Sequence, residues 1–166
     1  KLLAKSNPAL LEWLYSPVVY YENKEFVDKM RELANACFSP ITCAYHYIGI
    51  TKNFMDACEQ DYVKLKSYFY ALRTALAGKW IIEKGTIPPV DFMELLPIAP
   101  TAIQEKAAAL MTIKANQDEK YLHPKEPLIT NFLLQTLALN EEHVKGLGSG
   151  KKMAVELDGV FRSIII

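Results

Sequence analysis

Apolar side chains recur along most of this chain at the three- and four-residue spacing of an α-helix. The clearest run contains Leu65, Phe69, Leu72, Leu76 and Trp80, which would share one face of a helix. No segment alternates apolar and polar residues for long enough to predict a β-strand. The pattern therefore predicts an all-α protein.

Proline, glycine and capping side chains predict where the first helices begin and end. Asn7-Pro8, Asn23 and Ser39-Pro40 each supply a capping side chain before a helical run. Asp61 is expected to cap a fourth helix that ends at Gly85, where glycine allows a left-handed residue. The predicted helices are 8–15, 24–37, 40–59 and 61–84. The third is apolar almost all round and is expected at the centre of the bundle.

The second half of the chain predicts shorter helices between proline breaks. Asp91 can cap a short helix to Leu96, and Thr101-Ala102-Ile103-Gln104 fits a capping box at the start of the next. Further helices are predicted from Pro124 to about residue 145 and from Met153 to the end, separated by a flexible, solvated loop at 146–150. We expect one domain over 1–166, an irregular up-down bundle of about seven to eight helices.

Composition narrows the class of protein. The 166 residues are 51% hydrophobic and 23% charged, and 19 Lys and Arg balance 19 Asp and Glu. These values exclude a disordered chain and a strongly basic nucleic-acid arm. Three cysteines without a CxxC pair predict buried thiols, and no signal peptide or membrane span is recognisable, so we expect a soluble cytoplasmic protein. Because the chain begins at Lys1 within a helical pattern, we expect a fragment of a longer protein.

The usual phosphate and metal motifs are incomplete. The glycine-rich stretch 146–151 lacks the first Gly and the Ser/Thr of a Walker A motif. None of the three histidines follows a glutamate at the spacing used in di-iron bundles. We therefore expect no metal site in these residues.

A basic and aromatic strip on the two long helices is the best candidate binding site. Residues 61–84 carry five basic and two acidic side chains, a local excess in a neutral protein. Cations suit phosphates and tyrosine rings suit bases, so the strip is typical of nucleotide binding. The candidate residues are Tyr45, His46, Lys52, Lys64, Lys66, Tyr70 and Arg73. The residues alone also allow a plainer interpretation, in which the tyrosines belong to the core and the lysines to a solvated face.

Four ordered blocks carry a resemblance to a known family. They are Leu10-Leu11-Glu12-Trp13-Leu14-Tyr15-Ser16-Pro17-Val18-Val19-Tyr20, then Phe38-Ser39-Pro40 with Tyr45-His46-Tyr47, then 64–73, then Pro88-Pro89-Val90-Asp91-Phe92 with Leu95-Leu96. Over residues 1 to 96 the chain resembles the C-terminal half of bacterial predicted nucleotidyltransferases of the DNA polymerase β superfamily, a family of an RNA repair pathway. The resemblance fades after about residue 100.

The resemblance implies a division of labour between two domains. In that family an N-terminal α/β domain holds two Mg²⁺ ions and the nucleoside triphosphate through a Gly-Ser turn and an acidic pair. Gly148-Ser149 with Glu156 and Asp158 has the wrong spacing and order for that role. We therefore expect a helical C-terminal domain that is inactive alone, packs on its own catalytic domain and contacts nucleoside triphosphate or RNA through the strip. The alternatives are a purely structural or oligomerisation module and an independent nucleic-acid-binding domain.

Overall fold

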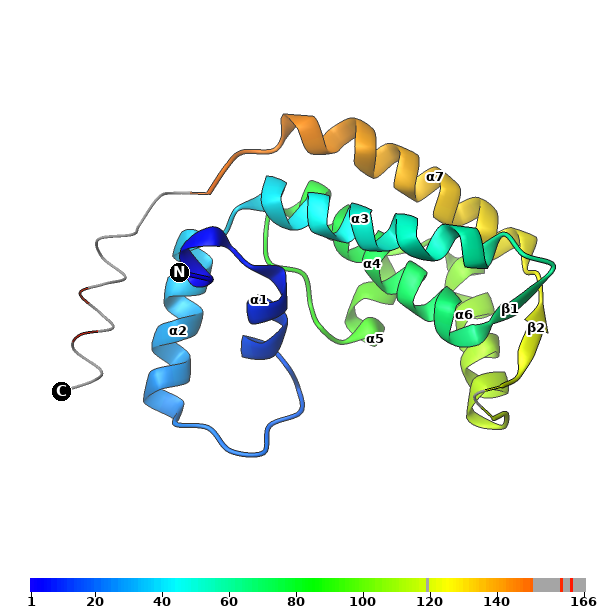
Figure 1. Cartoon of the computed structure of the whole chain (residues 1–166), viewed down its shortest axis with the longest axis horizontal. Helices are drawn as coiled ribbons and strands as arrows, with labels where there is room; N and C mark the ends of the chain where they lie inside the picture. The colour runs from blue at the N-terminus through cyan, green and yellow to red at the C-terminus, as the bar shows by residue number, and fades with distance from the viewer. Residues whose placement is uncertain (119, 151–158, 160–161, 163–166) are drawn as a thin grey trace.

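The computed structural model describes residues 1–118, 120–150, 159 and 162, and its elements are helical apart from one small ribbon (Figure 1). The helices are α1 (Pro8–Leu14), α2 (Lys24–Cys37), α3 (Pro40–Cys58), α4 (Leu65–Lys84), α5 (Phe92–Leu95), α6 (Thr101–Ala115) and α7 (Pro127–His143). The strands are β1 (Tyr62–Lys64) and β2 (Leu122–Pro124). The predicted all-α class is confirmed.

Helices α3, α4 and α7 pack on one another and form the centre of the molecule. The middle of α4 is buried on nearly every side, because Ala71, Leu72, Ala75 and Leu76 have no exposed surface. Polar groups in this layer pair with each other: Thr51 bonds Thr74 at 2.9 Å. In Figure 1 the helices α1, α2, α5 and α6 all lie on one side of this layer. The central position predicted for α3 is thereby confirmed.

The predicted helix caps largely hold. The side chains of Asn7, Asn23, Ser39 and Asp91 each accept a hydrogen bond from a backbone N–H in the first turn of the following helix. Gly85 ends α4 with φ of 67°, in the left-handed region that glycine enters without strain. Local side-chain chemistry therefore sets the starts of four of the seven α-helices in the described residues, and the end of α4.

Residues 62–64 were predicted as the first turn of a helix and instead form a strand. Val63 pairs with His123 in an antiparallel ladder, and the neighbouring Lys125 N–H donates to the Asp61 carbonyl at 2.8 Å. Helix α4 consequently begins at Leu65, and α7 begins at Pro127 because Leu122–Pro124 is the second strand. The backbone hydrogen bonds of residues 62–64 are made with a strand about 60 residues later in the sequence. A local sequence pattern therefore could not reveal the ribbon.

Two further predictions need correction. Pro100 occupies the position before α6, so there is no capping box; the Gln104 amide instead donates to the Ala99 carbonyl at 2.7 Å. The stretch 146–150 is not simply a solvated loop. Ile41 N–H donates to the Gly148 carbonyl at 3.4 Å, and a Cβ on Gly150 would lie 2.5 Å from the Phe38 carbonyl oxygen.

Other predictions from the sequence meet the structure only in part. All three cysteines are buried, as expected. No helix in the described part of the chain combines the length and apolar character needed to cross a bilayer. The helix predicted from Met153 onward falls outside the described residues, apart from 159 and 162.

Candidate functional site

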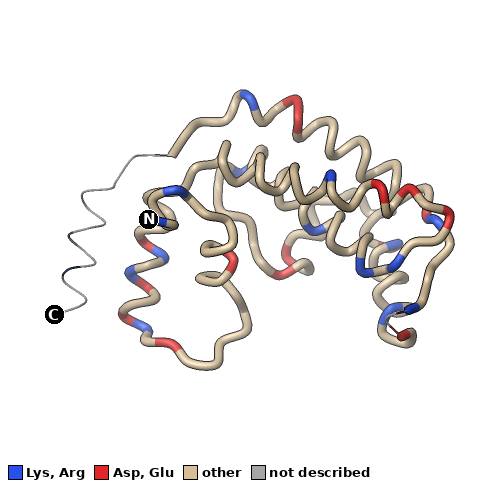
Figure 2. The backbone as a smooth tube through the Cα atoms, in the orientation of Figure 1, with Lys and Arg blue, Asp and Glu red and all other residues tan. Residues whose placement is uncertain are grey.

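A groove of about 740 Å³ lies between the start of α4, the helices α5 and α6, and the turn that follows α6. We call it the basic groove. Its polar and charged lining residues are Lys64, Lys66, Arg73, Lys114, Gln117 and Asp118, and its apolar or aromatic ones are Leu65, Phe69, Tyr70, Phe92, Met111, Ala115 and Tyr121. Figure 2 shows Lys and Arg positions gathered where the start of α4 approaches α6.

Three lysines make the groove electropositive. Lys64, Lys66 and Lys114 form no ion pair with any residue that the structure describes. Asp118 also lines the groove, where its carboxylate accepts a hydrogen bond from the Lys120 backbone N–H at 2.8 Å, and its single negative charge is outnumbered by the three lysines. Ammonium groups without a carboxylate partner are available to an anionic ligand such as phosphate.

Aromatic rings alternate with these cations. Tyr70 is 43% exposed, and its ring stacks on Phe54 at 5.2 Å between centroids with 6° between planes. The Lys66 ammonium lies 5.7 Å from the centre of the Tyr70 ring, and the Lys114 ammonium lies 6.0 Å from that of Phe69. Rings held by packing beside cations can stack on a base while the lysines pair with phosphates.

Arg73 lines the groove but is already engaged. One guanidinium N–H donates to the Glu12 carboxylate at 2.9 Å, and Nε–H donates to the Val90 carbonyl at 3.2 Å. The Tyr47 hydroxyl donates to the same Glu12 oxygen at 3.0 Å. Burial, together with the Glu12 charge and hydrogen bond, raises the pKa of Tyr47 above its ordinary value. These contacts, which we call the Glu12 network, join α1, α3, α4 and the loop before α5.

The other three predicted residues, Tyr45, His46 and Lys52, lie on α3 and do not line the groove. Lys52 forms an ion pair with Glu141 on α7. Tyr45 is 50% exposed, and the His46 ring makes an edge contact with Tyr47 at 5.5 Å. The structure therefore brings together four of the seven predicted residues: Lys64, Lys66, Tyr70 and Arg73.

Sequence reasoning missed the opposite wall of the groove. Phe92, Lys114 and Tyr121 come from α5, α6 and the turn before β2, 26 or more residues after Lys66 in the chain. No periodicity or motif links them to α4. A single lysine near the end of a helix is common, so only the three-dimensional arrangement identifies Lys114.

Tyr121 is held at the groove by a chain of hydrogen bonds. Its hydroxyl lies 3.0 Å from His123 Nδ1, and His123 Nε2 lies 3.1 Å from the Glu126 carboxylate. Lys106 pairs with the same carboxylate at 3.1 Å. Burial alone would raise the pKa of Glu126, but the hydrogen bonds and charges of His123 and Lys106 outweigh it and lower that pKa. The ionised carboxylate fixes the histidine, which in turn orients the tyrosine.

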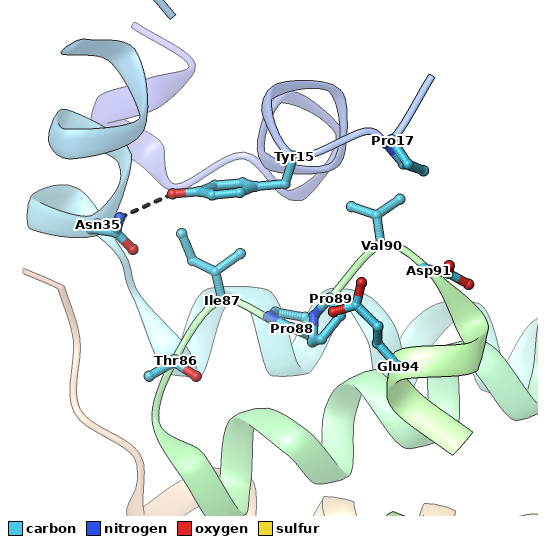
Figure 3. A pocket seen from close by; sticks show the side chains of 10 residues that line it. All are labelled: Tyr15, Pro17, Asn35, Thr86, Ile87, Pro88, Pro89, Val90, Asp91 and Glu94. Carbon is cyan, nitrogen blue, oxygen red and sulfur yellow. Dashed lines mark hydrogen bonds between the residues drawn. The ribbon is translucent and has the colours of Figure 1, made fainter. Parts of the chain in front are cut away.

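A second, smaller cavity of 380 Å³ lies on the other side of α5 (Figure 3). The 86–91 segment forms one wall, with the rings of Pro88 and Pro89, and Tyr15 and Pro17 form the other. Asn35 donates to the Tyr15 hydroxyl at 2.9 Å and fixes that ring. Asp91 and Glu94 supply carboxylates, so this cavity has the opposite charge to the basic groove.

Comparison with known proteins assigns the chain to a family. Residues 1–163 match the RNA repair pathway DNA polymerase beta family. The chain belongs to that family. The match continues well beyond residue 100, where we expected the resemblance to fade, so it also includes the residues of α6 and α7.

A curated relative is longer than this chain. The uncharacterized protein YcgL of Bacillus subtilis (strain 168) is 37% identical over 162 residues, which cover 95% of this chain and 62% of the relative. The chain therefore spans less than two thirds of that relative's length. No solved structure matches the chain. Among the described residues, no group of three or more His, Cys, Asp or Glu side chains could hold a metal ion.

Proposed function

We propose that these residues form the helical, substrate-side part of a nucleotidyltransferase, and that the basic groove binds the phosphates and a base of a nucleotide or RNA substrate. One observation carries the proposal: three lysines with no ion pair among the described residues stand beside ordered aromatic rings in one groove. Family membership makes a nucleotide ligand chemically consistent.

The proposed division of labour assigns the chemical step elsewhere. Lysines can neutralise phosphate charge and rings can hold a base, but the described residues bring together no group of three or more His, Cys, Asp or Glu side chains that could hold a metal ion. We propose that a catalytic domain of the whole protein supplies the Mg²⁺ site and that the helical part positions the substrate beside it. The 166 residues alone are then expected to transfer no nucleotide.

A purely structural module is the second candidate, and the Glu12 network favours it. That network engages Arg73, the most buried of the groove's four cations, in joining four parts of the fold. A structural role would make the fold sensitive to Arg73 while leaving Lys66 and Lys114 without any function. The two candidates therefore differ in what the lysines do.

The test compares two charge-matched double variants of the full-length protein. Lys66→Ala/Lys114→Ala removes two groove cations, and Lys24→Ala/Lys145→Ala removes two exposed lysines outside it. Fluorescence anisotropy with labelled ATP and with a labelled single-stranded RNA measures affinity. We expect the groove variant to bind about tenfold more weakly, a loss of about 1.4 kcal/mol, and the control to bind within about twofold of the wild type.

Salt dependence supplies an independent readout for RNA. Each lost phosphate contact should reduce the slope of log affinity against log salt by about 0.7 for a single strand. The groove variant should therefore lose roughly 1.4 from that slope. Equal affinity for wild type and groove variant, or an equal loss in the control, would leave the structural module as the better account.

A further inference from the structure

The end of α1 and the connection that follows it expose an unusual amount of apolar surface. Residues 13–21 contain no charged side chain. Within this stretch Trp13 is 76% exposed, Tyr20 98% and Tyr21 90%, and Val18 and Val19 are more than half exposed. We call these five side chains the 13–21 patch.

The patch is as large as the largest apolar patch of a typical monomer. At these exposures the three rings alone present roughly 400–650 Å², taking about 150–250 Å² for each full ring. The largest apolar patch on a typical monomer is about 300–600 Å² and is often functional. The rings and the two valines together therefore mark an interaction surface.

Hydrogen bonds hold the first part of this connection, up to Val18, in a defined shape. Arg31 donates to the Leu14 carbonyl at 2.9 Å, and Asn35 donates to the Tyr15 hydroxyl at the same distance. The Val18 N–H donates to the Ser16 hydroxyl at 3.2 Å. These bonds tie the start of the connection to α2 and close a tight turn, while the rings on either side point away from the core.

The patch adjoins the 380 Å³ cavity that carries the Asp91 and Glu94 carboxylates. Tyr15 and Pro17 line that cavity from within the same connection, opposite the prolines of the 86–91 segment (Figure 3). A partner that covers the patch can therefore insert a side chain into the cavity. Asp91 and Glu94 at its edge would favour a lysine or arginine from the partner.

We propose that the 13–21 patch and this cavity are the docking surface for the remainder of the full-length protein. This inference rests on the proposed function, in which these residues are one part of a longer enzyme. More than a third of the length of YcgL lies outside its match to this chain, so the relative contains enough polypeptide to cover the patch. The docked segment would present apolar side chains to the patch and a cation to Asp91 and Glu94.

Size also favours a partner within the same chain over a second copy. Stable complexes between separate chains bury about 800 Å² on each partner, which is more than the three rings supply. A tethered partner is held at an effective concentration of roughly millimolar, and contacts between domains of one chain start at about 600 Å². The same three rings, at roughly 400–650 Å², reach this lower value but not the first, so the patch is better suited to a tethered partner.

Thiol labelling of the full-length protein tests the docking directly. Tyr20→Cys places a reporter on the patch, and Leu139→Cys places a matched reporter on α7, where Leu139 is 53% exposed. The three cysteines of this chain are buried, so they contribute little background, and the unsubstituted full-length protein measures the rest. We expect a thiol reagent to modify the Tyr20→Cys variant at least tenfold more slowly than the Leu139→Cys variant. Equal rates would overturn the proposal.

Two further measurements identify the cause of protection. Adding Trp13→Asp to the Tyr20→Cys variant should raise its labelling rate to that of the Leu139→Cys control, because a buried charge opposes docking. Protection that survives Trp13→Asp, or that disappears on dilution as the protein becomes monomeric, would contradict an intrachain partner. Thiol labelling needs no nucleotide. The labelling experiment therefore tests docking independently of the affinity measurements that test the basic groove.

Discussion

Lys66 and Arg73 are both basic residues on one face of α4, but their surroundings in the structure differ. Lys66 near the start of the helix faces the open groove, beside the exposed ring of Tyr70. Arg73, two turns later on the same face, is neutralised by Glu12 and bonded to the Val90 carbonyl. Partners from distant parts of the chain, more than position on the helix, decide whether a cation holds the fold together or remains available to a ligand.

The largest expected effect is on the free energy of unfolding, and it separates the structural role of Arg73 from the ligand-binding role of Lys66. Arg73→Ala should lower the free energy of unfolding by about 2 kcal/mol, since it leaves the partly buried Glu12 carboxylate without its cation and the Val90 carbonyl without a donor. Lys66→Ala should change it by less than about 0.5 kcal/mol. Urea unfolding of the two variants measures both values, and similar losses would show that the contrast is mistaken.

Stacking on Tyr70 should contribute to ligand affinity without much effect on stability. Tyr70→Leu removes the ring and should weaken binding of single-stranded RNA by about 1–2 kcal/mol. Tyr70→Phe keeps the ring and its stacking on Phe54, so it should bind as the wild type does. Anisotropy titrations check this, and an equal loss in both variants would assign the effect to the hydroxyl group.

The hydrogen-bond chain behind Tyr121 predicts a pH effect on stability. Because the pKa of Glu126 is lower in the folded protein than its ordinary value of 4.5, its ionised form stabilises the fold. That contribution is present above pH 4.5 and is lost as the pH falls through the lower folded-state value. Glu126→Gln should cost about 1 kcal/mol at pH 7 and remove this part of the acid dependence. Urea unfolding at pH 7 and at pH 3 to 4 measures both, and an unchanged acid dependence in the variant would count against the account.

The smallest effect is expected at Lys52. Its ion pair with Glu141 is solvent-exposed, and such pairs contribute less than about 1 kcal/mol. Because Lys52 does not line the groove, Lys52→Ala should alter ligand affinity less than twofold. A loss comparable to that of the groove variant would restore Lys52 to the binding site, as the sequence suggested.

The sequence predicts those features that local chemistry determines. Capping by Asn23 and Ser39 and termination at Gly85 follow from side chains within a few positions of each helix end. The basic side of the groove was found because Lys66 and Tyr70 are one helical turn apart. Lys114 and Tyr121 were missed because only tertiary packing brings them to α4, and the engagement of Arg73 was missed because Glu12 lies 61 positions earlier.

The β1–β2 ribbon also bears on how this molecule folds. Its three-residue ladder joins segments about 60 residues apart, whereas α3 and α4 are neighbours in the chain. Closing a loop of about 60 residues costs conformational entropy, and the few hydrogen bonds of the ladder offset little of that cost. We therefore expect the ribbon to form after the helices have paired. Val63→Ala, at a buried position of β1, should then speed unfolding much more than it slows refolding. The wall of the groove that carries Tyr121 would be the last part of the site to assemble.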